Sequence, residues 1–245
     1  MATNEEKHRE ESIKKIQAEE TSKLREIMHR FHVADMFDLH KPGENHEEMI
    51  FVLLKYIEGK TTVTIKEGIY RMLSGVKWLS NAKLIELLDS LFEHFENNNM
   101  QFIDCSTPEA LVFFQSKPEY EGIRSMDELY AIHVRSMIGS TICELIKPKK
   151  SHYERYFQRL KTIVTDKSYR GRLGMVEAYA KLGKQEAVHD LIGLLDGWDL
   201  DVLDSTIKSL GKLKAKEAAP YLTELLKHED SYFRGIARKA LSRMA

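Results

Sequence analysis

One short helix pattern occurs twice in the chain, thirty-one residues apart. The stretch KQEAVHDLIGLL (184–195) is followed at that spacing by AKEAAPYLTELL (215–226). Aligned without a gap, residues 178–199 and 209–230 are identical at eight of 22 positions, where chance gives one or two at the roughly 5–10% frequency of common residues. The identical pairs are Lys181/Lys212, Leu182/Leu213, Glu186/Glu217, Ala187/Ala218, Leu191/Leu222, Leu194/Leu225, Leu195/Leu226 and Asp199/Asp230. Self-similarity at a fixed period indicates stacked units that share one continuous core.

Each unit is predicted to be a helical hairpin. The LxxLL spacing of the second helix places its three leucines on one face. One hairpin cannot bury both of its helices, so it must pack on its neighbour. Asp199 and Asp230 precede the next helix, where an aspartate side chain caps free backbone N–H groups. The pattern predicts helices at about 151–165, 168–182, 185–196, 200–213, 216–228 and 231–244.

Residues 150–245 resemble the short HEAT-like repeats of bacterial proteins, the type also found in phycobilisome-lyase proteins. DSYFRGIARKAL (230–241) matches the unit of that family, with Arg234 in its arginine place. Arg172 occupies the same place one unit earlier, with Ser168 for the leading Asp, whereas Leu203 stands where arginine is usual. The resemblance implies a curved stack whose second helices line the concave side. Its members mostly bind proteins, and a few bind DNA, including one class that excises alkylated bases.

We therefore expect an all-α fold, an αα-superhelix of HEAT-like repeats preceded by an irregular helical N-terminal region. Two domains are expected, 1–146 and 147–245, because helix, proline and charge all change at KPKK (147–150). Residues 1–12 have no apolar face and are expected to fray.

Local signals in the N-terminal region predict several further features. Residues 80–96 read as a strongly periodic helix, and MQFIDC (100–105) is the best strand candidate, with a short strand also possible at TTVT (61–64). Three capping boxes are expected. They pair Asn45 with Glu48, Ser106 with Glu109 near Pro108, and Ser125 with Glu128.

The composition, 42% hydrophobic and 31% charged, is that of a soluble globular protein. The N-terminus is polar, so no signal peptide is expected, and no segment approaches the roughly 20 apolar residues of a membrane span. Cys105 and Cys143 show no CxxC spacing, which favours the cytoplasm. No phosphate loop and no nucleophile in a recognisable setting is present, so neither an enzyme nor a cofactor is expected.

The charge is divided between the two halves. Residues 1–146 hold 17 Lys/Arg and 25 Asp/Glu, a net of −8, and residues 147–245 hold 20 and 13, a net of +7. The segment 147–172 contains nine basic and two acidic residues, interleaved with Tyr153, Tyr156 and Tyr169. Such a segment is either a set of solvated helix faces or a track for phosphates. The candidate nucleic-acid contacts are Lys149, Lys150, Arg155, Arg159, Arg170 and Arg172.

Two kinds of chemistry remain as alternatives. Glu26, His29 and His32 are weak metal candidates, because an ExxH pair on one helix face can share a metal. Only one such motif is present, and scattered surface histidines are the alternative interpretation. Base excision needs an aromatic pocket on a basic concave face. Trp198 lies instead in the turn between units, and the second helices are not basic.

The function predicted is that of a non-enzymatic protein-binding scaffold or adaptor with an unknown protein partner. The preformed face of a repeat stack binds with a low ordering cost. Nucleic-acid binding through 147–172 is the first alternative, and a metal-binding helical protein is the second. The predicted partner contacts are the exposed polar residues of the second helices, Gln185, His189, Asp190, Lys216 and Glu224.

Overall fold

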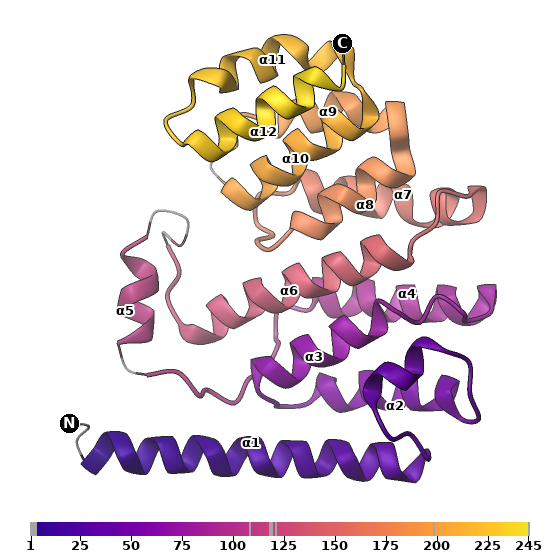
Figure 1. Ribbon diagram of the computed structural model, residues 1–245, viewed down its shortest axis with the longest axis vertical. Helices are drawn as coiled ribbons and strands as arrows, with labels where there is room; N and C mark the ends of the chain where they lie inside the picture. Colours follow the sequence, from indigo (N-terminus) through magenta and orange to yellow (C-terminus); the bar gives the residue numbers. More distant parts are fainter. Residues whose placement is uncertain (1–3, 108, 118–119, 121, 198, 245) are drawn as a thin grey trace. The chain divides into compact units, whose positions relative to one another are not determined.

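The computed structural model describes residues 4–107, 109–117, 120, 122–197 and 199–244 (Figure 1). Within these ranges every regular element is a helix and no strand forms, which confirms the all-α helical-repeat fold. Pro108 and Trp198, which the sequence placed near a helix start and in a turn between units, lie outside the described residues.

The contacts between residues divide the chain into two compact units. One comprises Met1–Ser116 and Gly122–Val134, and the other Lys117–Glu121 and Arg135–Ala245. The division falls within helix α6 (Met126–Leu145), earlier in the chain than the boundary expected after residue 146. Two domains that meet at 146/147 stay a prediction, because a division by contacts does not measure independent folding.

The N-terminal unit contains the following elements before α6: α1 (Asn4–Arg30), the 3₁₀ turn η1 (Met36–His40), α2 (His46–Glu58), α3 (Val63–Leu73), α4 (Asn81–Glu96) and α5 (Ala110–Gln115). Of the segment 1–12, expected to fray, residues 4–12 lie in α1, whose Glu-, Lys- and Arg-rich sequence has a high helix propensity, and residues 1–3 lie outside the described residues. The fraying itself stays a prediction. The core lies among α2, α3 and α4, whose apolar faces are fully buried at Leu53, Ile69 and Leu91. Ser80 caps α4 by accepting a hydrogen bond from the backbone N–H of Lys83.

A buried carboxylate joins α1 to the start of α3. Glu20 is only 4% exposed and accepts hydrogen bonds from the Thr62 backbone N–H (2.8 Å) and hydroxyl (2.6 Å). One turn later, the buried Lys66 ammonium donates to the carbonyls of Ile57 and Gly59 at the end of α2. Free backbone groups at the connection between α2 and α3 are thus satisfied by two charged side chains.

Several local predictions for this unit are wrong. The strand expected at 100–105 is a single parallel bridge between Thr61 and Phe102, because neither segment has a further partner to extend a ladder. Asn45 adopts a left-handed conformation and makes no side-chain cap, and Glu109 at the start of α5 makes none either. The pair Ser125 and Glu128 forms half of the expected capping box at the start of α6, because the Glu128 carboxylate bonds the Arg124 N–H in place of the Ser125 N–H. There Glu128 N–H donates to Ser125 Oγ (3.2 Å), and its carboxylate accepts from the Arg124 N–H (2.9 Å).

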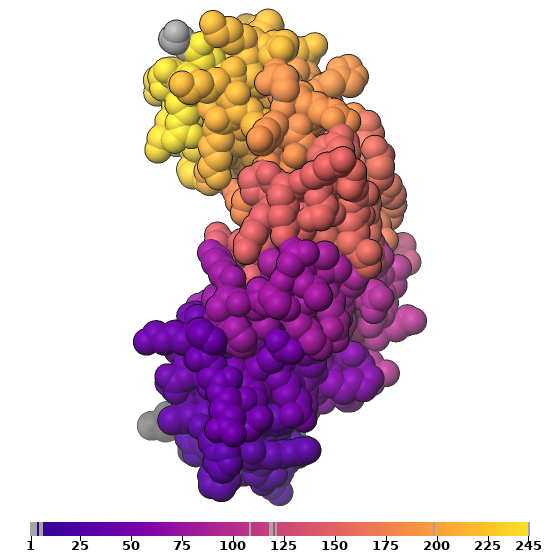
Figure 2. All heavy atoms as spheres, turned by 90° about the vertical axis from the view of Figure 1, so that its right-hand side faces the viewer, coloured from indigo at the N-terminus to yellow at the C-terminus, as the bar shows by residue number. Residues whose placement is uncertain are grey.

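The C-terminal unit is a stack of helical hairpins. The first helices α8, α10 and α12 pack side by side, and α7, α9 and α11 lie in a second layer (Figure 1). In the space-filling view, the colours along this unit follow the order of the chain, from α7 to α12 (Figure 2). The elements are α7 (Lys150–Thr165), α8 (Leu173–Gly183), η3 (Lys184–Ala187), α9 (Val188–Gly193), α10 (Leu200–Leu213), η4 (Lys216–Ala218), α11 (Ala219–Glu224), η5 (Leu225–Lys227) and α12 (Ser231–Ser242).

The caps of these helices follow the repeat. Asp199 accepts a hydrogen bond from the Val202 N–H and Asp230 from the Tyr232 N–H, as predicted for helix N-caps. The helix expected from 168 begins only at Leu173, because Gly171 has a positive φ of 75°, which a helix cannot contain.

The arginine place of the repeat has a structural role. The Arg172 guanidinium is 4% exposed and donates to the carbonyls of Val164 (2.7 Å) and Asp166 (2.9 Å), at the end of α7. It also lies 3.8 Å from the Asp199 carboxylate. Arg234 makes the same bonds two units later, to the carbonyls of His228 and Glu229. The arginine therefore satisfies the carbonyls that end the preceding helix.

The replacement Arg172→Ala should lower the free energy of unfolding by about 2–4 kcal/mol, because it leaves the buried Val164 carbonyl, the partly buried Asp166 carbonyl and the Asp199 carboxylate without their partner. Urea denaturation measures this. The matched control is Lys150→Ala, since that side chain is 88% exposed, and it should change stability by less than about 0.5 kcal/mol. Equal effects of the two replacements would contradict the assigned role.

Helices α6 and α8 approach closely at two glycines. A Cβ atom added at Gly174 would overlap the backbone of Gly139 and Ser140, which leaves no room for any side chain. Gly235 in α12 has no atom within 4 Å of such a Cβ.

Gly174→Ala should destabilise the protein by about 1–3 kcal/mol, because the helices must separate to admit the methyl group. Gly235→Ala should instead be neutral or stabilising by about 0.5–1 kcal/mol, because alanine favours a helix and meets open space. Thermal or urea denaturation of the two variants tests the close approach, and a neutral Gly174→Ala would refute it.

Candidate functional site

The second helices present an exposed polar surface over two successive units. Gln185, His189, Lys216 and Glu224 are all exposed, and Tyr221 among them is 49% exposed. Gln185 Nε2 donates to Glu217 Oε1 (3.2 Å), so side chains of neighbouring units meet across this surface. We call the exposed residues Gln185, His189, Lys216, Tyr221 and Glu224 the second-helix surface.

Asp190, predicted to be an exposed contact residue, is turned toward the protein. Its side chain is 16% exposed and accepts hydrogen bonds from the Tyr179 hydroxyl (2.5 Å) and from the Lys161 ammonium (2.9 Å). These two donors hold the pKa of Asp190 below its usual range although burial acts to raise it, and burial together with Asp190 raises the pKa of Tyr179. Asp190 therefore links α7, α8 and α9 and is not free to contact a partner.

The predicted nucleic-acid contacts are not one exposed track. Lys150 and Arg155 are exposed on α7, whereas Lys149, Arg159 and Arg170 are half-buried. Arg172 is buried, and its bonds to Val164 and Asp166 remove it from any such track. Arg172 was wrongly predicted to be an exposed contact because charged side chains usually lie on the surface.

The aromatic side chains of the same segment also pack inward. Tyr156 is 1% exposed, and the Tyr153 ring stacks on Phe157 with centroids 4.6 Å apart. The Tyr153 hydroxyl donates to Glu186 (2.5 Å). Phe157 thus covers one face of the Tyr153 ring, and Tyr169 is half-buried.

The histidines near the end of α1 do not converge. Glu26, His29 and His32 are exposed, while His40 Nε2 lies 3.0 Å from the Met72 carbonyl and His46 Nδ1 2.9 Å from that of Lys41. Over the described ranges, no group of three or more His, Cys, Asp or Glu side chains is placed to hold a metal.

A cluster of titratable groups lies in the N-terminal unit. The Tyr70 hydroxyl is 2.8 Å from His94 Nδ1, and His94 Nε2 is 3.6 Å from Glu58. Burial raises the pKa of Tyr70 and lowers that of His94. The cavity beside them measures about 20 Å³, room for a single water molecule and for no substrate.

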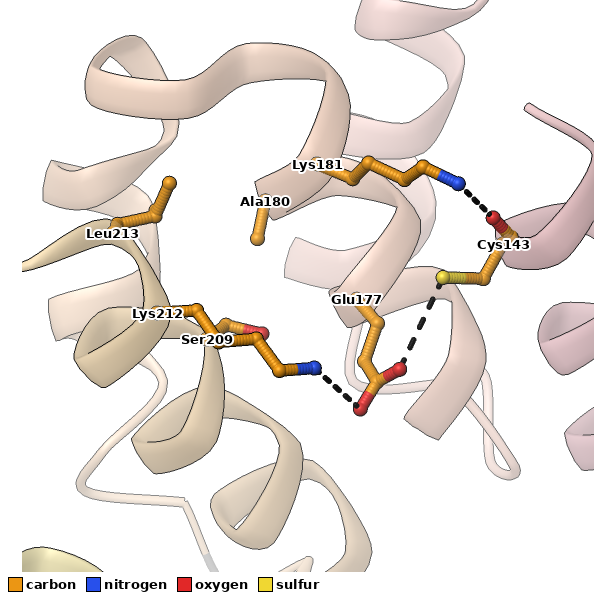
Figure 3. A pocket seen from close by; sticks show the side chains of 7 residues that line it. All are labelled: Cys143, Glu177, Ala180, Lys181, Ser209, Lys212 and Leu213. Carbon is orange, nitrogen blue, oxygen red and sulfur yellow. Dashed lines mark hydrogen bonds and ion pairs between the residues drawn. The ribbon is translucent and has the colours of Figure 1, made fainter. Parts of the chain in front are cut away.

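A larger pocket lies in the C-terminal unit between the end of α6, α8 and α10 (Figure 3). Its volume is about 300 Å³. The lining residues are Cys143, Glu177, Ala180, Lys181, Ser209, Lys212 and Leu213. This site was not predicted from sequence, although Lys181 and Lys212 are one of the identical pairs in the repeat.

Two lysines and one carboxylate set the charge of this pocket (Figure 3). Lys181 Nζ donates to the Cys143 carbonyl (2.7 Å), and Lys212 Nζ lies 3.9 Å from Glu177 Oε1. Burial, and then the Glu177 charge, raise the pKa of the Cys143 thiol to about 11, so the thiol is protonated at neutral pH. A protonated thiol is a poor nucleophile, and the arrangement is suited to binding.

Residues 157–242 match the HEAT repeats family, which agrees with the stack of helical hairpins. No curated protein and no solved structure matches the chain. HEAT repeats commonly form protein-interaction scaffolds and are generally non-enzymatic. Among the described helices, none is both long enough and apolar enough to cross a membrane.

His152, at the start of α7, gives the C-terminal unit a pH-dependent stability. The imidazole is fully buried, and its Nδ1 accepts a hydrogen bond from the Lys147 N–H (3.0 Å). Burial, and then the charges of Lys149 and Lys147, lower its pKa to about 4.

As the pH falls below 6.5 the unfolded chain binds a proton at His152, whereas the folded protein does not until about pH 4. The free energy of unfolding should therefore fall by about 3 kcal/mol over this window from His152 alone. His152→Asn keeps an acceptor for the Lys147 N–H and removes the titration. The difference in stability between wild type and variant, from urea titrations at several pH values, should shift by this amount, and a difference independent of pH would contradict it.

Proposed function

We propose that this protein is a non-enzymatic scaffold or adaptor that binds a protein partner. The observation that carries the proposal is the second-helix surface, which continues over two successive units of a HEAT-repeat stack. Its side chains stand on packed helices, so little conformational freedom is lost on binding. An exposed tyrosine amid polar residues, as at Tyr221, is typical of protein interfaces.

The polar clusters of the molecule support a binding role over catalysis. The Cys143 thiol is protonated, and the group of Tyr70, His94 and Glu58 has no room for a substrate.

We further propose that the repeats are of the phycobilisome-lyase type and that the protein is cytoplasmic. Arg172 and Arg234 make equivalent bonds in the arginine place of that repeat type. Cys105 and Cys143 are free thiols, which a reducing compartment favours.

Nucleic-acid binding through the basic segment is the competing proposal. Five of its six residues, Lys149, Lys150, Arg155, Arg159 and Arg170, remain at least partly accessible. It is weaker than the scaffold proposal because Arg172 and Tyr156 face inward.

The test is to isolate the tagged protein from nuclease-treated extract of its host and to compare it with the charge-exchange variant Lys216→Glu/Glu224→Lys. We expect one stoichiometric protein partner on the wild type, with affinity for the purified partner reduced about tenfold or more in the variant. The matched control, Lys150→Glu, alters an exposed charge on α7 and should retain the partner.

Two results would overturn the proposal. One is a partner retained equally by the charge-exchange variant. The other is nucleic acid from untreated extract, with no protein partner, that is lost when Arg155 and Arg159 are replaced by alanine. That second result would move nucleic-acid binding to first place, and its affinity would fall steeply with salt.

A further inference from the structure

Three cations occupy one position of the repeat on the first helices. Lys181, Lys212 and Arg243 are spaced by thirty-one residues and stand at the ends of α8, α10 and α12. We call these three residues the basic row. They belong to other helices than the second-helix surface, so they define a separate site.

The helix ends that carry the basic row are neighbours. Ala180 of α8 and Lys212 of α10 line the same pocket (Figure 3). At the next step, a Cβ at Gly211 of α10 would lie 2.9 Å from Ala240 of α12. The row therefore crosses three adjacent helices, whose axes in such packing are about 8–10 Å apart.

The positive charge of the row is only partly neutralised within the protein. Lys181 uses one of its three N–H groups on the Cys143 carbonyl. The Lys212 side chain is 62% exposed, and its carboxylate partner Glu177 is 3.9 Å away. The exposed Arg243 guanidinium makes no hydrogen bond or ion pair within the described part of the chain. Within the described part of the chain, Lys212 is thus the one cation of the row with a carboxylate partner.

The pocket beside Lys181 and Lys212 supplies a second observation that points to a ligand. Ser209 is 2% exposed and lines the pocket, and its hydroxyl makes no hydrogen bond with any described residue. A hydroxyl that lines a pocket without a partner in the protein can bond a ligand there. Ala180 and Leu213 supply apolar walls beside it. A ligand group that accepts from Ser209 and pairs with Lys212 fits these surroundings.

We propose that the basic row and this pocket bind an extended acidic peptide segment of a partner protein, with one carboxylate to each cation. A peptide in the polyproline II conformation rises about 3.1 Å per residue with about three residues per turn, so every third side chain lies on one face, about 9 Å from the next, which matches a step of one helix. The segment then carries Asp or Glu at every third position. The side chain that meets Lys212 also reaches Ser209. The inference rests on the proposed function only in taking a protein as the ligand.

Favourable interaction with the helix dipole accounts for a basic residue in a last helical turn. It does not account for the unpaired Ser209 hydroxyl, for the pocket, or for a lysine that reaches the neighbouring helix. A test therefore has to separate binding from helix stability.

The experiment measures fluorescence anisotropy of a labelled peptide with three glutamates, one at every third position, separated by serine and alanine. A peptide of the same composition with consecutive glutamates is the control ligand. Lys212→Glu/Arg243→Glu changes only the two exposed cations and leaves the bond from Lys181 to Cys143 in place. Lys150→Glu/Lys167→Glu makes the same change of net charge elsewhere in the C-terminal unit.

We expect the spaced peptide to bind about fivefold tighter than the clustered one. The Lys212→Glu/Arg243→Glu variant should lose about tenfold or more in affinity, and the Lys150→Glu/Lys167→Glu control less than about twofold. The charge-exchange variant Lys216→Glu/Glu224→Lys should bind the peptide normally, which separates this site from the second-helix surface.

Equal binding of the two peptides, or equal losses in the two charge variants, would overturn the proposal in favour of non-specific attraction. Binding of a single-stranded oligonucleotide in place of the peptide would overturn it too. Thermal denaturation of every variant checks the fold, which we expect to be retained because all six altered side chains are exposed.

Discussion

Where α6 and α8 cross, no side chain separates the two backbones, because residues 139 and 174 are both glycine. That approach brings the end of α6 near enough for Lys181 to reach the Cys143 carbonyl and for Glu177 to face the thiol. The next helix continues the layer, and Lys212 reaches back to Glu177. The pocket between α6, α8 and α10 is therefore a product of how tightly the first helices pack. A bulkier residue at the crossing would displace its walls.

The repeat predicted most of the C-terminal fold. The fixed spacing of its leucines and the position of Asp199 and Asp230 were sufficient to predict the order of the helices and the caps of α10 and α12, although not the start of α8. Where a local motif stood alone it was less informative. Asn45 has the residue type of a cap, but its left-handed backbone points the side chain elsewhere. The segment at 100–105 has strand propensity, but a strand needs a partner of matching length.

Polar residues of the candidate site were harder to place than apolar ones. Periodicity shows which side of a helix is buried, yet a long charged side chain at the margin can turn in either direction. Arg172 turns inward to bond carbonyls that end α7, and Asp190 turns inward to Tyr179 and Lys161. The sequence spacing of Arg172 and Asp190 does not show which groups these two side chains bond. For Arg172 a signal did exist, because Arg234 recurs in the same place of the repeat and a recurring arginine points to a common structural role.

The spacing of thirty-one residues has a consequence for how such a chain can change length. Each unit contains a capping aspartate, the packing leucines and a cation at the end of its first helix, so duplicating one unit copies all three together. A protein with more units would gain the same surface and the same positive charge with each unit, and it would fold through the same contacts between units. Such a protein could bind a longer ligand, because each added unit would extend the row of cations by the same distance.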